Sequence, residues 1–411
     1  MPESYQKKWG GHVMGTVRPL TPNDLPEARK IGTVSSLAPK DAGRADPTIF
    51  SDYRALRGVF DENNGNRMAA LHCVLKRRMM LDGQSVQVGC ISGYAARPEM
   101  KNLHGMDVKL MSETLREMHG QGLPLSWVFP HSYEFYRQFG YELGAQLTIT
   151  DRVPLTHLLV EPQPAGAQPV QAGEDTESLR ACYQRFVADK NLALLRGDEE
   201  WNRFFVSDDL LGDVHIYAVR DARGIVTGYM RFVIEEIEGV TCARVTEMIY
   251  DAREAMLALL GKLRQMKDAY GFVILPVNPG MPLSALIATP YNACIKFTPC
   301  GIGRIVDAQA ALLSMRAPAG RGAAVIATAD TLLPTNNGPF RVCWEKGRIV
   351  SVERVSQTPD LFVPLNRLLQ LVVGFISMRE ALLLPGVTLT GAQDELLSFF
   401  SRREGLLLDE F

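Results

Sequence analysis

The sequence has no long apolar run. No stretch of about 18 uncharged apolar residues, the length that a membrane-spanning helix needs, occurs in the chain. The N-terminal segment, MPESYQKKWGGHVMG, contains no apolar region of the kind found in a signal peptide. These two absences predict a cytoplasmic protein that does not bind membranes.

Paired cysteines are also missing. The seven cysteines are scattered along the chain and contain no CxxC pair. Such a set is typical of buried thiols in a reducing compartment, and not of a disulfide framework or a zinc site. The histidines show no spacing that is typical of metal ligands. We therefore expect no bound metal.

A large charge of one sign is absent as well. With 44 basic and 46 acidic residues the formal net charge is −2, so no bulk positive field attracts nucleic acid. The hydrophobic content of 46% and the charged content of 22% are ordinary for a globular protein. A chain of 411 residues exceeds what one core usually supports, so we expect two or three domains.

The first segment of the chain contains one clear hairpin. Two apolar runs, residues 68–80 and 85–96, flank the pair Asp82-Gly83. This pair favours a tight turn, because glycine tolerates the positive φ that such turns need. The other elements predicted in this segment are strands at 17–20, 125–129 and 146–150 and helices at 23–37 and 106–119.

A second segment repeats this outline. A linker rich in proline, glycine and alanine, residues 161–175, precedes it and favours a domain boundary. The predicted elements are a helix at 176–188, a hairpin formed by 216–220 and 225–234, strands at 243–250 and 272–276, and a helix at 251–270. We interpret the recurring hairpin, helix and buried strand as an internal duplication.

A third segment begins near residue 304. Its predicted elements are helices at 308–315 and 365–376, a strand at 323–327 and a hairpin formed by 340–345 and 348–354. The chain ends with the apolar and acidic run LLLDEF.

Residues 89–118 carry the first pattern with chemical content. A strand is followed by a proline, a loop with a basic residue and glycine, and a helix. Such an arrangement aims the N–H groups of a helix N-terminus at an anion such as a pyrophosphate, and the helix dipole adds to the attraction. Taken alone, the pattern is more often a plain connection than a binding site.

Three separate motifs resemble a known family. Residues 89–105 resemble the cofactor motif of the GNAT acetyltransferases, in which V-x-P-x-x-R-G-x-G ends a strand. The run WVFPHSYEFYRQFGYELG, Trp127–Gly144, resembles the P-x-x-x-x-F-Y-R-x-F-G-[FY]-E signature of the enhanced-intracellular-survival (Eis-type) acetyltransferases. LPTNNGPFRV, LLQLVVGFISMREAL and the chain end resemble the sterol-carrier-like domain of that family. The resemblance therefore covers essentially the whole chain.

This resemblance implies an α/β (α+β) architecture in three parts. Residues 1–155 are expected to form a GNAT domain that binds acetyl-CoA and performs catalysis. Residues 156–303 are expected to form a second, degenerate GNAT-like domain, and residues 304–411 a sterol-carrier-like domain that supplies its C-terminal carboxylate to the active site. Each GNAT-like domain is expected to contain a mixed sheet, and the family implies a homo-oligomer.

The resemblance also implies two catalytic groups. Tyr136 corresponds to the general acid of the family, and the main-chain carboxylate of Phe411 corresponds to the base. Glu410 would attract a cationic substrate. The alternatives are that Tyr136 is a core residue with its hydroxyl at the rim and that the terminus is frayed. The apolar run before the terminus favours docking over fraying.

The cofactor contacts follow by position. Tyr94, Ala95 and Ala96 correspond to the strand that pairs with the pantetheine arm, and His131 and Ser132 correspond to a contact just before the catalytic tyrosine. The pyrophosphate loop corresponds to Lys101, Asn102, Leu103, His104, Gly105, Met106 and Asp107.

The chain departs from the family pattern in this loop. It lacks the arginines that contact phosphate with two hydrogen bonds, its glycine is displaced by one residue, and Asp107 would repel a pyrophosphate. The corresponding loop of the second segment, residues 250–254, has neither proline nor glycine, so we expect no acetyl-CoA there.

Two functions remain open on this basis. The first is an acetyl-CoA-dependent N-acetyltransferase that acts by direct attack on a primary amine, either an aminoglycoside-like molecule, a polyamine or a lysine side chain. The second is a non-catalytic GNAT-derived scaffold, or a ligand-binding oligomer, that has lost its affinity for acetyl-CoA. The intact signature around Tyr136 and the apolar chain end favour the enzyme.

Overall fold

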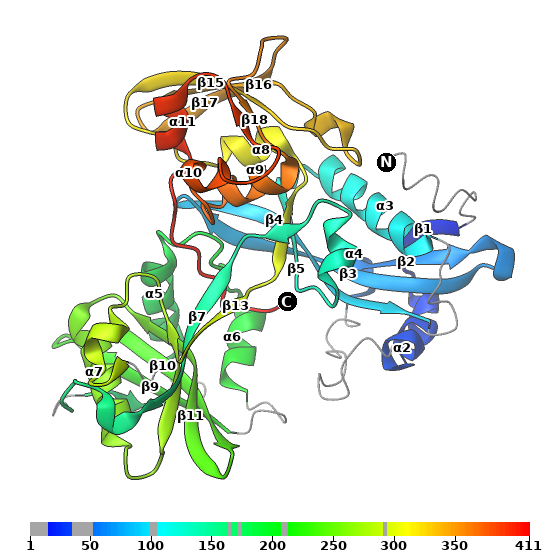
Figure 1. Ribbon diagram of the computed structural model, residues 1–411. Coiled ribbons are helices and arrows are strands. Elements are labelled where there is room, and N and C mark those ends of the chain that lie inside the picture. Colours follow the sequence, from blue (N-terminus) through cyan, green and yellow to red (C-terminus); the bar gives the residue numbers. More distant parts are fainter. Residues whose placement is uncertain are drawn as a thin grey trace. The chain divides into compact units, whose positions relative to one another are not determined.

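The computed structural model describes most of the chain (Figure 1). The described residues are 15–34, 52–97, 105–162, 166–170, 175–206, 213–290 and 294–411. The chain divides into two compact units, each with its own core. The first unit comprises Met1–Gly144, Gly301–Arg403 and Asp409–Phe411, and the second comprises Ala145–Cys300 and Glu404–Leu408.

The described residues of the first unit build a seven-stranded mixed sheet (Figure 1). In spatial order its strands are β1 (Gly15–Pro19), β2 (Leu56–Asp61), β3 (Arg67–Leu81), β4 (Gln84–Ala96), β5 (Leu125–Val128), β14 (Ile302–Ile305) and β6 (Glu142–Leu143). Strands β4 and β5 run parallel, and the other neighbours run antiparallel. Sequence analysis missed β2, β6 and β14.

The β3–β4 hairpin confirms the turn that was predicted at Asp82-Gly83. Both residues have left-handed backbone conformations, with φ of 51° and 78°. Two consecutive positive φ values give a turn whose twist matches that of the flanking strands. The turn therefore sets the register of the two strands, in which Leu81 lies opposite Gln84.

Helices cover both faces of this sheet. α2 (Leu25–Val34) packs in a cluster with Leu71 and Cys73 of β3, whereas the apolar stripe of α3 (Met106–Gly120) packs with Val74. Because successive side chains of a strand point to opposite faces, the two helices lie on opposite sides of the sheet. The remaining short helices here are η1 (Pro22–Asp24), η3 (Tyr53–Ala55), η4 (Glu62–Asn64) and α4 (Tyr133–Arg137).

The other described part of the first unit, which follows β14 in sequence, contains a five-stranded sheet. In spatial order its strands are β17 (Arg348–Arg354), β16 (Phe340–Glu345), β15 (Arg321–Ala327), β18 (Leu361–Phe362) and β19 (Thr388–Leu389). Its helices are α8 (Ala308–Leu313), η9 (Pro334–Asn336), α9 (Leu365–Val372), α10 (Met378–Ala381) and α11 (Gln393–Phe399). The helix α9 ends before the predicted residue 376, because Gly374 adopts the left-handed conformation that terminates helices (φ 74°).

The described residues of the second unit build another seven-stranded mixed sheet. In spatial order its strands are β13 (Cys294–Pro299), β7 (Gln146–Pro154), β12 (Phe272–Val277), β11 (Val240–Tyr250), β10 (Val226–Ile237), β9 (Val214–Arg220) and β8 (Gln168–Pro169). Its helices are η6 (Leu155–His157), α5 (Thr176–Val187), α6 (Asp198–Phe205), α7 (Arg253–Gln265) and η7 (Leu283–Leu286). The parallel pair β11–β12, joined by α7, repeats β4–β5 and α3, which supports the predicted duplication.

The two sheets exchange a strand. Residues 146–150 were predicted to close the first domain, but β7 pairs with β12 and β13 of the second sheet. In return, β14 follows the last strand of the second sheet in sequence and pairs with β5 and β6 of the first. The placement of residues 146–150 was therefore wrong, because short strands carry no local signal of which sheet they join. The three-domain division at residues 155/156 and 303/304 stays a prediction.

The contact between β14 and β5 is unusually close. Trp127 of β5 is fully buried, and its ring lies against Gly303 of β14. A Cβ atom at Gly303 would lie 2.2 Å from the indole, so this position requires glycine. The next residue, Arg304, forms an ion pair with Asp330 in which the side chains are only 1% and 3% exposed. β14 therefore joins the first sheet to the segment that follows it.

Among the described residues, no helix combines the length and the apolar character that crossing a bilayer would require.

Replacing Gly303 by alanine is expected to lower the free energy of unfolding by about 3 kcal/mol, because the new methyl group overlaps the Trp127 ring in a close-packed core. The urea midpoint of unfolding measures this change. Gly120→Ala is the matched control, since a Cβ atom there meets no atom within 4 Å. Equal midpoints for the two variants would contradict the close contact.

Candidate active site

Strands β4 and β5 separate before β4 ends. Their parallel pairing covers Val88–Ile91 and Leu125–Val128, whereas β4 continues to Ala96. Beyond Ile91, the described residues of β4 pair with β3 alone, and a bulge near Gly93 (φ 59°) shifts the register there. One edge of the backbone at Ser92–Ala96 is therefore open to an extended, amide-bearing ligand.

An aromatic cluster surrounds this opening. The ring of His131 stacks on Tyr94, with 5.2 Å between the ring centroids and 16° between the planes. Tyr136 meets His131 edge-on at 5.4 Å, and Phe135 contacts both Tyr94 and Tyr136. Three residues that sequence analysis assigned to the site, namely Tyr94, His131 and Tyr136, therefore lie together.

Tyr136 is the next-to-last residue of the short helix α4. The Ser132 Oγ accepts a hydrogen bond of 3.2 Å from the Phe135 N–H and so caps the start of this helix. The Tyr136 side chain is 1% exposed and packs in the apolar cluster beneath α3. Burial, together with the neighbouring Tyr141 and Tyr94, holds the pKa of Tyr136 far above its usual range. The phenol is therefore protonated at neutral pH, as a proton donor must be.

The C-terminus docks near the same end of β5. The Phe411 ring packs edge-on against Phe129, the residue that follows β5, with ring centroids 5.1 Å apart. Phe411 is partly buried and Glu410 is exposed. This contact contradicts the alternative of a frayed terminus. Both residues predicted to perform catalysis therefore lie in the first unit, close to residues that follow β5.

The start of α3 carries a carboxylate of its own. Gly105 precedes the helix with φ 87°, and Met106 is buried beside Tyr94. The Asp107 Oδ1 accepts a hydrogen bond of 2.8 Å from the Val108 N–H. Burial raises the pKa of Asp107, although its backbone hydrogen bonds act against this. The Val108 N–H, which could donate to a pyrophosphate at this helix start, thus donates to the Asp107 carboxylate instead.

The signature around Tyr136 is largely structural. Arg137 pairs with Glu142 at 2.9 Å and so links α4 to β6. Gly140 has φ 84°, which favours glycine. Glu142 also lies 3.6 Å from Arg367 of α9. Burial alone would raise the pKa of Glu142, but the Leu143 N–H and these arginines bring it below its usual value. The motif therefore holds the tyrosine helix in place.

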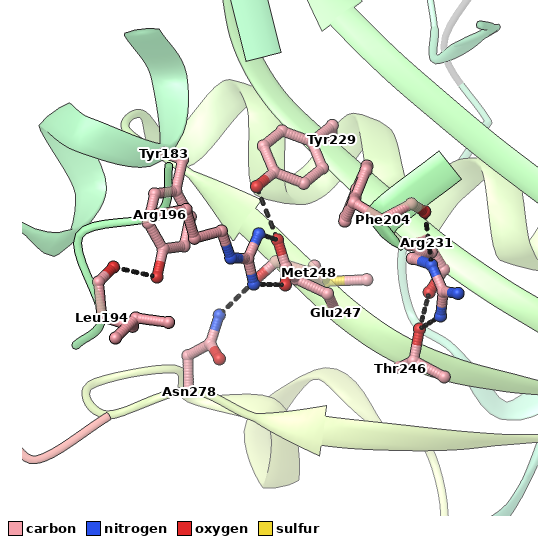
Figure 2. A network of polar contacts seen from close by, with 10 residues as sticks. All are labelled: Tyr183, Leu194, Arg196, Phe204, Tyr229, Arg231, Thr246, Glu247, Met248 and Asn278. Carbon is pink, nitrogen blue, oxygen red and sulfur yellow. Dashed lines mark hydrogen bonds and ion pairs between the residues drawn. The ribbon is translucent and has the colours of Figure 1, made fainter. Parts of the chain in front are cut away.

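The corresponding part of the second sheet carries a network of polar side chains (Figure 2). The pairing of β11 with β12 ends at Arg244 and Ile274. Beyond this point the Asn278 amide donates a hydrogen bond to the Met248 carbonyl and so bridges the two strands. The Glu247 carboxylate forms an ion pair with Arg196 and accepts a hydrogen bond from Tyr229.

Aromatic rings enclose the cation of this pair. The Arg196 guanidinium lies 4.2 Å from the centroid of Tyr183, 5.2 Å from that of Trp201 and 5.6 Å from that of Phe204. Trp201 is 2% exposed, so it is a core residue of the second unit. The buried Arg196–Glu247 pair is therefore enclosed by aromatic side chains.

The structure places most of the predicted cofactor residues but not all. Ala95 and Ala96 are buried on β4, where their backbone faces the opening. Lys101, Asn102, Leu103 and His104 lie outside the described residues. Sequence analysis missed Phe129 and Phe135, although both fall within the WVFPHSYEFYRQFGYELG run. For Phe129, the position directly after a buried strand was the available signal.

Comparison with protein families identifies three regions of the chain. Residues 16–144 match an acetyltransferase (GNAT) domain. Residues 192–305 match a second acetyltransferase (GNAT) domain model, and residues 309–406 match a sterol carrier protein domain. No functionally curated protein matches the chain in sequence. The predicted fold class, two GNAT-like mixed-sheet domains followed by a sterol-carrier-like domain, is confirmed.

Solved structures share this fold along almost the whole chain. A GCN5-related N-acetyltransferase from Anabaena variabilis is 18% identical, with a TM-score of 0.85, and the match covers 97% of this chain and 100% of that one. Eis1 from Mycobacterium abscessus is 19% identical, with a TM-score of 0.79 and the same coverage. A GCN5-related N-acetyltransferase from Kribbella flavida is 16% identical, with a TM-score of 0.76, covering 97% and 98%. At such low identity these matches establish the fold alone.

The chain is an enzyme of the GNAT acetyltransferase class. Its GNAT domains imply acetyl-CoA as co-substrate and an acceptor for the acetyl group. Within the described ranges, no group of three or more His, Cys, Asp or Glu side chains is arranged to hold a metal ion.

Replacing Arg196 by methionine is expected to lower the free energy of unfolding by about 3–5 kcal/mol, because it leaves the Glu247 carboxylate buried without its cation. The double variant Arg196→Met/Glu247→Gln should recover part of this loss. Urea denaturation measures both. The control is Glu238→Gln, which breaks an exposed ion pair with Arg152 and should leave the midpoint unchanged. If Arg196→Met behaves like this control, the buried pair does not stabilise the second sheet.

Proposed function

We propose that this enzyme transfers the acetyl group of acetyl-CoA to a primary amine by direct attack, with Tyr136 as general acid and the carboxylate of Phe411 as general base. One observation carries the proposal. The buried Tyr136 and the docked Phe411 both lie by the residues that follow β5, next to the opening where β4 separates from its parallel neighbour. The sequence match to a GNAT domain covers this region.

The open edge of β4 suits the amide-bearing arm of the co-substrate. Peptide-like amides can pair with the free backbone groups of Ser92–Ala96 as an added strand would. Tyr94 and His131 line this opening with their stacked rings. Acetyl-CoA supplies an acetyl group activated as a thioester, and the residues of the chain orient it.

Tyr136 is suited to donate a proton to the departing thiolate. A phenol and a thiol ordinarily titrate near pKa 10 and 8.5. Burial disfavours the anion of both groups, so a thiolate formed in the same apolar surroundings is also a stronger base than in water. The high pKa of Tyr136 therefore does not by itself prevent transfer of the proton.

The carboxylate of Phe411 is suited to accept the proton that the amine loses. An α-carboxylate in water titrates near pKa 3.3–3.7 and is a weak base. The edge-on contact with Phe129 and the partial burial of Phe411 hold this residue against the first unit. Removal of water from a carboxylate strengthens it as a base. Glu410 is exposed beside it and would attract a cationic acceptor.

The acceptor is proposed as an aminoglycoside-like molecule, a polyamine or a lysine side chain. The second GNAT domain is proposed to bind no acetyl-CoA, because Asn278, Glu247 and Arg196 fill the position that corresponds to the opening beside β4. A homo-oligomer in the cytoplasm, without nucleic-acid or membrane partners, completes the proposal.

A second candidate is a GNAT-derived scaffold that does not bind acetyl-CoA. The observation that favours it is the Asp107 carboxylate, which bonds the Val108 N–H at the start of α3. A negative charge there opposes a pyrophosphate.

Acetyl-CoA is expected to raise the thermal midpoint of the purified protein. Ligand at 100 times its Kd stabilises the folded state by about 2.7 kcal/mol. Differential scanning fluorimetry with millimolar acetyl-CoA measures the shift, and Asp107→Asn should enlarge it by removing the opposing charge. If acetyl-CoA raises the thermal midpoint of neither the native protein nor Asp107→Asn, the non-catalytic scaffold becomes the favoured function.

Tyr136→Phe and a chain that ends at Glu410 are each expected to lower kcat by about 10²–10⁴, the range found for general acids and bases. The assay is thiol release from acetyl-CoA with a panel of amines. Tyr141→Phe is the matched control for the tyrosine, because the Tyr141 hydroxyl bonds only the Ser126 hydroxyl among the described residues (2.7 Å). Phe411→Ala keeps a terminal carboxylate at the same position and should lose less activity than the truncated chain. Full activity in the truncated chain would exclude the carboxylate as the base.

A further inference from the structure

The C-terminal tail begins at a tightly held residue. The Arg403 N–H donates a hydrogen bond of 2.9 Å to the Gly374 carbonyl. Gly374 has φ 74°, and a Cβ atom there would lie 2.5 Å from the Cβ of Arg403. The backbone of Arg403 is therefore pressed against a position that only glycine fills without strain. The tail of eight residues that reaches Phe411 starts from this point.

The side chain of Arg403 forms a second, more distant attachment. Its Nε lies 2.7 Å from the Asp82 Oδ1, and the two side chains are 17% and 3% exposed. The Asp82 Oδ2 accepts a hydrogen bond of 2.8 Å from the Arg316 N–H. Burial lowers the pKa of Arg403, and the Asp82 carboxylate opposes this effect. An ion pair so little exposed is strong only while both partners stay in position.

Asp82 lies in the turn that precedes the strand bordering the candidate active site. It forms the turn of the β3–β4 hairpin, and β4 runs from this turn to Tyr94 and Ala96. The carboxylate that holds the start of the tail and the ring that lines the opening are thus parts of one hairpin.

The rest of the tail is also held. In the second unit, the Asn191 N–H donates to the Glu404 carbonyl and the Leu406 N–H donates to the Asn191 carbonyl, both at 2.8 Å. Lys190 pairs with Glu404 at 2.6 Å, and Leu407 is 2% exposed. The last three residues belong to the first unit again, where Phe411 meets Phe129.

We propose that Asp82 and Arg403 are a positioning pair that fixes the origin of the C-terminal tail, so that the Phe411 carboxylate reaches the acetyl-transfer site in a single register. This inference rests on the proposed function, since it concerns the carboxylate as base. A chain of eight residues without any attachment would have a root-mean-square span of about 16 Å, so each attachment of the tail narrows the range over which its carboxylate can lie. Displacement of a reacting group by about 1 Å can cost 10²-fold in rate.

Other contacts hold the sterol-carrier segment, so the pair can be broken by itself. Arg304 and Asp330 form their buried ion pair, and the Gln370 amide donates to the Leu143 carbonyl at 2.8 Å. Neither contact involves Asp82 or Arg403. These contacts remain when the pair is lost, and the side-chain oxygen of an asparagine at position 82 can still accept the hydrogen bond from the Arg316 N–H.

The experiment compares Arg403→Gln and Asp82→Asn with the full-length enzyme. Asparagine tolerates the left-handed conformation at position 82, so this variant keeps the turn. Each variant is expected to lower kcat by about 10–100-fold while KM for acetyl-CoA changes less than twofold. Arg403→Lys, which keeps the charge, should recover part of kcat. Arg402→Gln is the matched control, because Arg402 pairs with Glu380 on the surface and should leave kcat unchanged.

A double-variant cycle separates positioning from a general structural effect. In the chain that ends at Glu410, Arg403→Gln should cause no further loss of kcat, because the group it positions is gone. Additive losses, or an Arg403→Gln enzyme that behaves like Arg402→Gln, would overturn the positioning role. If the truncation itself leaves kcat intact, the proposed base is wrong, and that failure is distinct from the first.

Carboxypeptidase digestion gives a readout that needs no activity. The enzyme with the pair intact should release Phe411 slowly, and Arg403→Gln and Asp82→Asn should release it at least tenfold faster, whereas Arg402→Gln should match the intact chain. Equal release from all four proteins overturns the inference. Should Arg403→Gln fail to fold, as its thermal midpoint would reveal, the comparison of Asp82→Asn with Arg402→Gln decides in the same way.

Discussion

The insertion of β14 between β5 and β6 is the constraint on which the first unit depends. It needs a glycine at position 303, because the indole of Trp127 occupies the space where a side chain would lie. It also brings Arg304 to Asp330, where burial of both charges makes the ion pair intolerant of separation. β14 follows the second sheet in sequence, so the first sheet cannot be completed before residue 305 has joined it. Such a long-range pairing carries a large loop-closure cost, which local structure alone cannot offset.

The candidate site depends on this insertion through β5. The strand is held on one side by β4 and on the other by β14, so the residues after Val128 leave the sheet at a fixed place. Those residues include Phe129, which receives the chain end, and His131, which stacks on Tyr94. The position of Tyr136 thus depends on the packing of β14, a strand that lies more than 150 residues later in the sequence. A substitution in β14 is therefore expected to displace residues of the candidate site, although β14 itself contains no reacting group.

Sequence analysis located the elements whose signals are local. The turn at Asp82-Gly83, the apolar stripe of α3 and the buried strand β5 each follow from residues within one window, and the structure contains all three. The strand exchange does not follow from any window. Residues 302–305 (IGRI) do not alternate between apolar and polar side chains, and their pairing with β5 requires the glycine at position 303 beside Trp127. The contact of Phe411 with Phe129 was missed for the same reason, since it joins two segments that are distant in sequence.

The two GNAT domains show why a shared fold does not settle where a ligand binds. Both sheets contain a parallel pair that separates beyond its first residues. In the second sheet, Asn278 bridges the separation and Arg196 neutralises Glu247 within a ring of aromatic side chains. In the first, Tyr94 and His131 stack beside the opening and leave the edge of β4 without a partner strand among the described residues. The two sheets therefore differ in their side chains. In the second sheet polar side chains bond one another and the backbone, whereas in the first sheet backbone groups of β4 stay available. Topology therefore determines where an opening can form, and these side chains determine whether it can take a ligand.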